Sequence, residues 1–244
     1  MSVFRRFCLV VSCVLAGALF WPVLTHADDL AFPGYSGFLN VPSASVLAHG
    51  QAEIGYSDQG FVAGDYGHYR NFHAAVGVFP LVEIGGRIIW NDTHANLFTD
   101  CCGPRDLSAN VKVRAPFIPE HWFSLAAGAQ DVGGEANYFD AYYVVAGRQL
   151  GPVELALGYG RPDEVPRYLD GGFAALSYRP TRWLNLMLEH DAVDARAGVG
   201  LTTPRGWLPA GIQLKGKALA YDRGDSDNGR RFFSLGISIP LNQP

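Results

Sequence analysis

The chain has 244 residues, of which 48% are hydrophobic and 17% charged, and its formal net charge is −4 at pH 7. A mildly acidic chain lacks the basic surface that binds nucleic acid, so we expect no nucleic-acid partner. Loss of an N-terminal leader that carries two arginines would reduce the 19 basic residues to 17 against 23 acidic ones, a net charge of −6.

The first 27 residues have the parts of a secretory signal peptide. Two arginines precede an apolar run over residues 7–20, and Thr25 and Ala27 supply small residues at the −3 and −1 positions of a cleavage site. We therefore expect residues 1–27 to direct secretion and to be cleaved after Ala27. Two alternatives stay open: a membrane anchor, although the run is short for a spanning helix of about 20 residues, and lipidation at Cys13.

Cleavage after Ala27 would leave Cys101 and Cys102 as the remaining cysteines. One adjacent pair excludes a disulfide framework and a thiolate metal site. A strained ring, a bond to another chain and two free thiols all stay open for this pair.

Beyond residue 50, apolar and polar side chains alternate along the chain. In the last such stretch Phe233, Leu235 and Ile237 fall on one face, with Ser234 and Ser238 on the other. A period of two is that of a β-strand. We predict twelve strands, at residues 51–57, 71–79, 82–90, 108–114, 122–130, 141–148, 153–160, 171–179, 184–191, 196–202, 211–222 and 232–239.

A long series of strands with one apolar face each, behind a secretion signal, predicts an all-β protein. The fold class is a single antiparallel transmembrane β-barrel of about 12 strands, over residues 51–244. Residues 28–50 are rich in Gly, Pro and Ser and suit neither strand nor helix. We expect them to form a periplasmic lead-in or plug segment.

The predicted connections alternate in length. Those at 80–81, 149–152 and 180–182 are short, and those at 91–107, 131–140, 161–170 and 223–231 are longer and polar. Outer-membrane barrels have short periplasmic turns and long external loops, so the loop with the cysteine pair is expected at the cell surface. The short link after Asp191 breaks this pattern.

Charges of both signs occupy the polar positions of the predicted strands. Each would cost several kcal/mol against lipid, so these side chains should face the lumen. The lumen-facing candidates are Glu53, Glu83, Arg87, Lys112, Glu154, Glu189, Lys215 and Lys217. Since both signs occur, we expect a salt-bridged, partly filled lumen and no single-sign selectivity filter.

The strongest candidate for catalysis is His190 beside Asp191, with Ser177 and Ser234 on other strands. Outer-membrane barrel enzymes use Ser-His pairs or triads on lipids. Consecutive strand residues point to opposite faces, however, so His190 and Asp191 cannot serve one site without a bulge. Residues 222–228 lack the spacing and closing glutamate of a calcium loop. We predict no catalytic residue, no cofactor and no metal site.

Several segments together suggest a family. Residues 34–44 combine glycine, a small polar residue, glycine, two apolar residues and then Pro-Ser-Ala. Residues 106–112, 124–134, 142–146 and 155–160 follow as a strand, a turn with two glycines, a Tyr-containing strand and a Gly-rich strand. This order resembles the YjbH-type exopolysaccharide outer-membrane proteins. Members of that family are longer and typically lipoproteins, and this chain ends in Leu-Asn-Gln-Pro, without a terminal aromatic residue.

The resemblance implies an outer-membrane barrel that acts with exopolysaccharide machinery and has no known catalytic residues. We therefore predict a non-enzymatic accessory of exopolysaccharide export or surface assembly, in the outer membrane of a Gram-negative-type bacterium. Its expected partners are outer-membrane lipids, a polysaccharide and other export proteins.

Three alternatives remain. A general porin or small-solute channel would need an open pore, and an outer-membrane lipid-modifying enzyme would need a Ser-His-acid arrangement at one rim. A soluble periplasmic β-protein would need a second sheet against each strand.

Overall fold

The computed structural model describes residues 29–58, 69–91, 103–119, 121–132, 140–162, 169–222 and 232–241. The expected signal peptide, Cys13 and the pair Cys101 and Cys102 lie outside these residues, as does most of the segment 222–228. In the described ranges no helix has the length and apolar character needed to cross a membrane.

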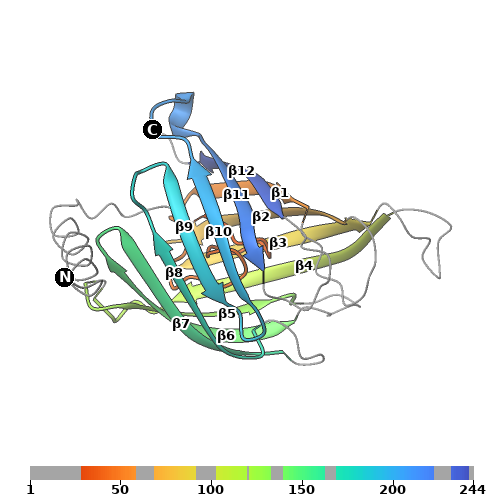
Figure 1. Cartoon of the computed structure of the whole chain (residues 1–244), viewed down its shortest axis with the longest axis vertical. Coiled ribbons are helices and arrows are strands. Elements are labelled where there is room, and N and C mark those ends of the chain that lie inside the picture. The colour runs from red at the N-terminus through yellow and green to blue at the C-terminus, as the bar shows by residue number, and fades with distance from the viewer. Residues whose placement is uncertain are drawn as a thin grey trace, which may run out of the picture.

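Twelve antiparallel strands form one closed barrel (Figure 1), which confirms the predicted fold class. They are β1 (Gln51–Ser57), β2 (Tyr69–Phe79), β3 (Val82–Asn91), β4 (Gly103–Arg114), β5 (Ser124–Gln130), β6 (Ala141–Leu150), β7 (Val153–Arg161), β8 (Gly171–Tyr178), β9 (Leu184–His190), β10 (Ala195–Thr202), β11 (Gln213–Asp222) and β12 (Phe233–Pro240). Each strand pairs with its neighbours in the sequence, and β1 closes the ring against β12. Closure leaves no free sheet edge, which is the condition for a sheet to cross a bilayer.

Six strands begin at a residue other than the predicted one: β10 and β12 differ by one residue, β2, β5 and β11 by two, and β4 by five. β4 begins five residues early, at Gly103, because it pairs with β3 as far as Asn91. β5 begins at Ser124, since the N–H of Trp122 closes a turn on the carbonyl of Pro119 at 2.9 Å. β11 begins at Gln213, after a 3-10 turn over Pro209–Gly211.

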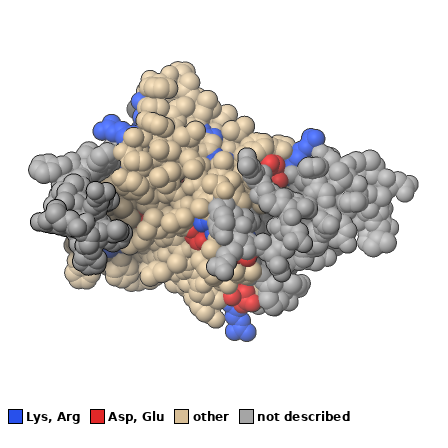
Figure 2. Space-filling model, in the orientation of Figure 1, with Lys and Arg blue, Asp and Glu red and all other residues tan. Residues whose placement is uncertain are grey.

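The outer face of the barrel is apolar. Ile54, Leu157 and Leu235, near the middle of β1, β7 and β12, are 57%, 67% and 60% exposed. Over the described part of the face in Figure 2 the surface is mostly uncharged, with only scattered Lys, Arg, Asp and Glu. One closed sheet contains all twelve strands, so among the described residues no second sheet packs on this apolar surface.

The two ends of the barrel differ in their connections. One end, here called the turn end, contains the start of β1, the end of β12 and the short turns at 80–81 and 151–152. The opposite end is called the loop end. Its one short link, after Asp191, is closed by that carboxylate, which accepts the N–H groups of Val193 (3.2 Å) and Asp194 (2.9 Å) and pairs with Arg196.

Candidate functional site

Residues 29–50, here called the plug, lie inside the barrel (Figure 1). The plug contains isolated β-bridges and turns but no helix or strand, and its backbone folds on itself. The N–H of Ala31 donates to the carbonyl of Tyr35 (2.7 Å), and that of Phe32 to the carbonyl of Leu39 (2.8 Å). Gly34 makes the first bend with a φ of +89°, a conformation that favours glycine. The result is a compact coil whose residues 29–36 are all buried.

Glu189 on β9 binds the tip of this coil. Its carboxylate accepts the backbone N–H groups of Leu39 (3.0 Å), Asn40 (2.9 Å) and Val41 (3.1 Å). Three consecutive N–H groups that converge on one anion form a nest, an arrangement that favours a negative charge. The buried carboxylate is thereby satisfied by the plug backbone.

Glu83 and Lys112 bind a second stretch of the plug. Glu83 on β3 accepts the N–H and hydroxyl of Ser36 (2.8 and 2.6 Å) and the N–H of Leu47 (2.8 Å). Lys112 on β4 donates to the carbonyls of Ser36 (2.7 Å) and Ser43 (3.4 Å) and lies 3.7 Å from Glu83. Both wall side chains are 1% exposed, so the ion pair and the plug contacts form one buried network.

Two lysines of β11 bind the first residues of the plug. Lys217 donates to the carbonyls of Leu30 (2.7 Å) and Phe38 (2.7 Å), and to that of Gly37 at 3.2 Å. Lys215 pairs with Asp29 (3.1 Å) and with Glu53 of β1.

The charges on this part of the wall also shift the pKa of Asp29. Burial alone would raise the pKa of the Asp29 carboxyl, but the positive charges of Lys215, Lys217 and Arg179 outweigh burial and lower the pKa below its usual range. Asp29 therefore enters the lumen as an anion at neutral pH.

Two wall asparagines also bind the plug backbone, although the sequence pattern alone did not single them out. Asn71 on β2 donates to the carbonyl of Phe32 (2.8 Å), and Asn110 on β4 donates to the carbonyls of Pro33 (2.8 Å) and Gly34 (3.2 Å). The alternation of strand residues could have identified them. Asn71 precedes His73 by two positions and Asn110 precedes Lys112 by two, so each asparagine points to the same face as its polar neighbour.

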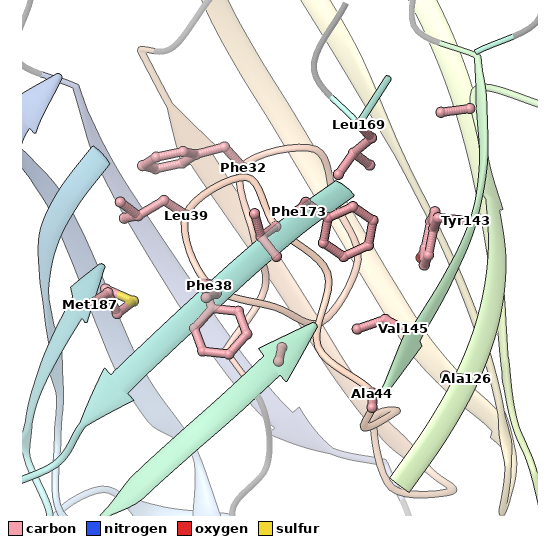
Figure 3. Close-up of a cluster of buried hydrophobic side chains, with 14 of the residues drawn as sticks. Phe32, Phe38, Leu39, Ala44, Ala126, Tyr143, Val145, Leu169, Phe173 and Met187 are labelled. Atoms are coloured by element: carbon pink, nitrogen blue, oxygen red, sulfur yellow. The ribbon is translucent and has the colours of Figure 1, made fainter. Parts of the chain in front are cut away.

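Apolar side chains of the plug pack against apolar side chains of the barrel wall (Figure 3). Phe32, Phe38, Leu39, Val41 and Ala44 join one buried cluster with wall side chains. The wall members of that cluster include Ala126, Tyr143, Val145, Phe173 and Met187. The lumen therefore contains a hydrophobic core, as a soluble domain does.

Glycines on the inner wall make room for the plug backbone. A Cβ on Gly85 would stand 2.2 Å from the carbonyl oxygen of Gly34, and one on Gly77 2.1 Å from that of Ala48. By contrast, a Cβ on Gly172 would meet nothing within 4 Å. The wall and the plug are thus complementary in shape as well as in charge.

The eight lumen-facing candidates are all between 1% and 9% exposed. The structure brings five of them, Glu53, Glu83, Lys112, Glu189 and Lys217, into contact with the plug backbone, and Lys215 into contact with Asp29. Glu154 lies apart near the turn end, 3.2 Å from Arg179. Arg87 is buried on β3 opposite His73 and Ser108.

The structure does not assemble the predicted histidine candidates into a catalytic arrangement within the described residues. His190 is exposed, and its Nδ1 accepts the N–H of Ala192 (3.1 Å), whereas Asp191 is buried and paired with Arg196. Ser177 is fully buried inside the barrel, opposite Glu154 and Met187 on the adjacent strands. The described ranges also contain no group of three or more His, Cys, Asp or Glu side chains suited to a metal ion.

Comparison with known proteins gives one family. Residues 31–163 match the YjbH family model, described as exopolysaccharide biosynthesis protein YbjH. The chain is also 30% identical over 132 residues to "Uncharacterized lipoprotein YjbH" of Escherichia coli strain K12. That alignment covers 52% of this chain but only 18% of the relative, so the chain matches a small part of that protein.

Two solved structures match the chain at low similarity. The outer membrane phospholipase dimer of Salmonella typhi with bound calcium has a TM-score of 0.44 at 9% identity, over 81% of this chain and 92% of that chain. An active-site mutant of outer membrane phospholipase A from Escherichia coli has a TM-score of 0.41 at 9% identity, over 94% and 97%.

Proposed function

The chain belongs to the YjbH family of exopolysaccharide biosynthesis proteins, and we propose that it is a non-catalytic accessory of exopolysaccharide export or surface assembly in the outer membrane. In this role the barrel neither conducts the polymer nor cleaves it. The observation that carries the proposal is the filled lumen, in which the plug occupies the space that a translocating chain would need.

An outer-membrane location is supported by the surface of the barrel. The strands expose large apolar side chains to the outside, while charges point inward, which is the arrangement that lipid requires. The signal peptide expected over residues 1–27 would deliver the chain across the inner membrane. The turn end would then face the periplasm, and the loop end the cell exterior.

The buried wall charges favour an accessory over a porin. A porin keeps a water-filled lumen whose charged side chains meet solvent. Here Glu83, Lys112 and Glu189 are instead satisfied by the plug backbone. The family description supports the polysaccharide role. The filled lumen supports a contribution made at the surfaces of the barrel.

Deletion of the gene tests this function. We expect less surface polysaccharide and unchanged uptake of small hydrophilic antibiotics, because a filled barrel contributes no permeability. Polysaccharide can be measured by lectin or dye binding, and permeability by antibiotic susceptibility, with restoration by the full-length gene as control. Normal polysaccharide together with reduced antibiotic uptake would contradict the proposal and favour a small-solute channel.

A further inference from the structure

We propose that the inner wall of the barrel is a binding site for polypeptide main chain, which residues 29–48 occupy as a bound ligand. On this view the wall retains the ligand even when its covalent link to β1 is cut. The proposal deepens the proposed function by naming what keeps the lumen closed, and it is tested on purified protein without reference to polysaccharide.

The wall binds the plug mainly through the main chain of the plug. Three glutamates accept backbone N–H groups, those of Leu30, Ser36, Leu39, Asn40, Val41 and Leu47. Two lysines and two asparagines donate to backbone carbonyls, those of Leu30, Phe32, Pro33, Gly34, Ser36, Gly37, Phe38 and Ser43. The plug side chains of Asp29 and Ser36 also contact charged wall groups, through an ion pair with Lys215 and a hydrogen bond to Glu83.

The charge or polarity of each wall group matches the main-chain atoms that it meets. Carboxylates stand where N–H groups converge, and ammonium or amide groups stand where carbonyls converge. At Glu189 three consecutive N–H donors point at one carboxylate, and at Lys217 three carbonyls surround one ammonium. Charge-assisted hydrogen bonds are roughly twice as strong as neutral ones, so these groups select a folded peptide backbone.

One short, exposed link joins the plug covalently to the barrel. The plug joins β1 through Ala48 and His49, which are both exposed and outside the buried contacts. The wall hydrogen bonds and ion pairs named above all involve residues 29–47. A cut between Ala48 and His49 would therefore leave every one of these contacts in place.

The experiment uses the full chain with a protease site inserted between Ala48 and His49. The protein is folded in detergent, cut, and passed over a gel-filtration column. Retention of the plug fragment is then measured by mass spectrometry. The chain has three lysines, Lys112, Lys215 and Lys217, and all are buried wall residues. A water-soluble amine reagent should therefore leave them unmodified while the plug is bound.

We expect the cut protein to retain the fragment and to keep its lysines unmodified. Glu189→Gln should speed release of the fragment by about tenfold or more, because a charged acceptor of three N–H groups is lost. Glu154→Gln is the matched control, since Glu154 is a lumen glutamate that pairs with Arg179 of the wall near the turn end, and it should behave like the parent. Lys217→Met is a second test variant if the glutamine variant fails to fold before cutting.

Two results would overturn the proposal. Prompt release of the fragment from the parent would mean that the covalent link holds the plug in place. Equal retention by the parent, Glu189→Gln and Lys217→Met would mean that apolar packing, and not recognition of the main chain, retains it.

Discussion

Glu83→Leu is expected to lower the free energy of unfolding by about 3 to 5 kcal/mol, the usual cost of breaking a buried ion pair from one side. The change removes the carboxylate that lies 3.7 Å from the buried ammonium of Lys112. It also removes the acceptor of the N–H groups of Ser36 and Leu47. Unfolding in urea, followed by the gel shift between folded and boiled protein, measures the loss.

Glu154→Leu is the control for this substitution. Glu154 also faces the lumen and pairs with a cation, but both partners are partly exposed near the turn end. The side chains of Glu154 and Arg179 are 11% and 14% exposed, against 1% for both Glu83 and Lys112, so water can still reach the remaining charge and the control should lose less stability. Equal losses in the two variants would show that the network around Glu83 does not connect the plug to the wall.

Leu157→Arg is expected to cost about 2 to 4 kcal/mol in a lipid bilayer, because it places a charge on the outer face near mid-depth. Leu157 is the central residue of β7 and is 67% exposed. The effect should depend on lipid, so it is measured by urea titration of the protein in phospholipid vesicles.

Leu214→Arg is the matched control for depth. Leu214 also points outward, but it is the second residue of β11 and lies near the turn end. Close to the membrane interface the same change should cost about 0 to 1 kcal/mol. If both variants lost the same stability, the apolar outer face would not be a lipid-facing surface.

The sequence was sufficient to predict the barrel because its signal is local. Period-two alternation in single strands, such as Phe233 to Ile237, identifies both the strand and its two faces. Even β10, which contains Arg196 and begins after an unusually short link, begins within one residue of its predicted position. Strand ends were less predictable where long-range pairing decides them, as at Gly103.

The arrangement of the plug could not be predicted in the same way. Its contacts join residues far apart in the chain, such as Asn40 and Glu189, and they involve the backbone, which every sequence shares. The bend at Gly34 and the close approach of the plug backbone to Gly85 likewise arise only when the plug and the wall are folded together. The sequence indicated which charges avoid lipid, but not what would neutralise them.

Single-channel recording in planar bilayers tests most directly whether the plug closes the barrel. Full-length protein, with insertion verified by protease protection, should give no steady current across a range of voltages, because residues 29–50 fill the lumen. Large and steady single-channel currents from the same folded protein would contradict the account and would indicate an open pore.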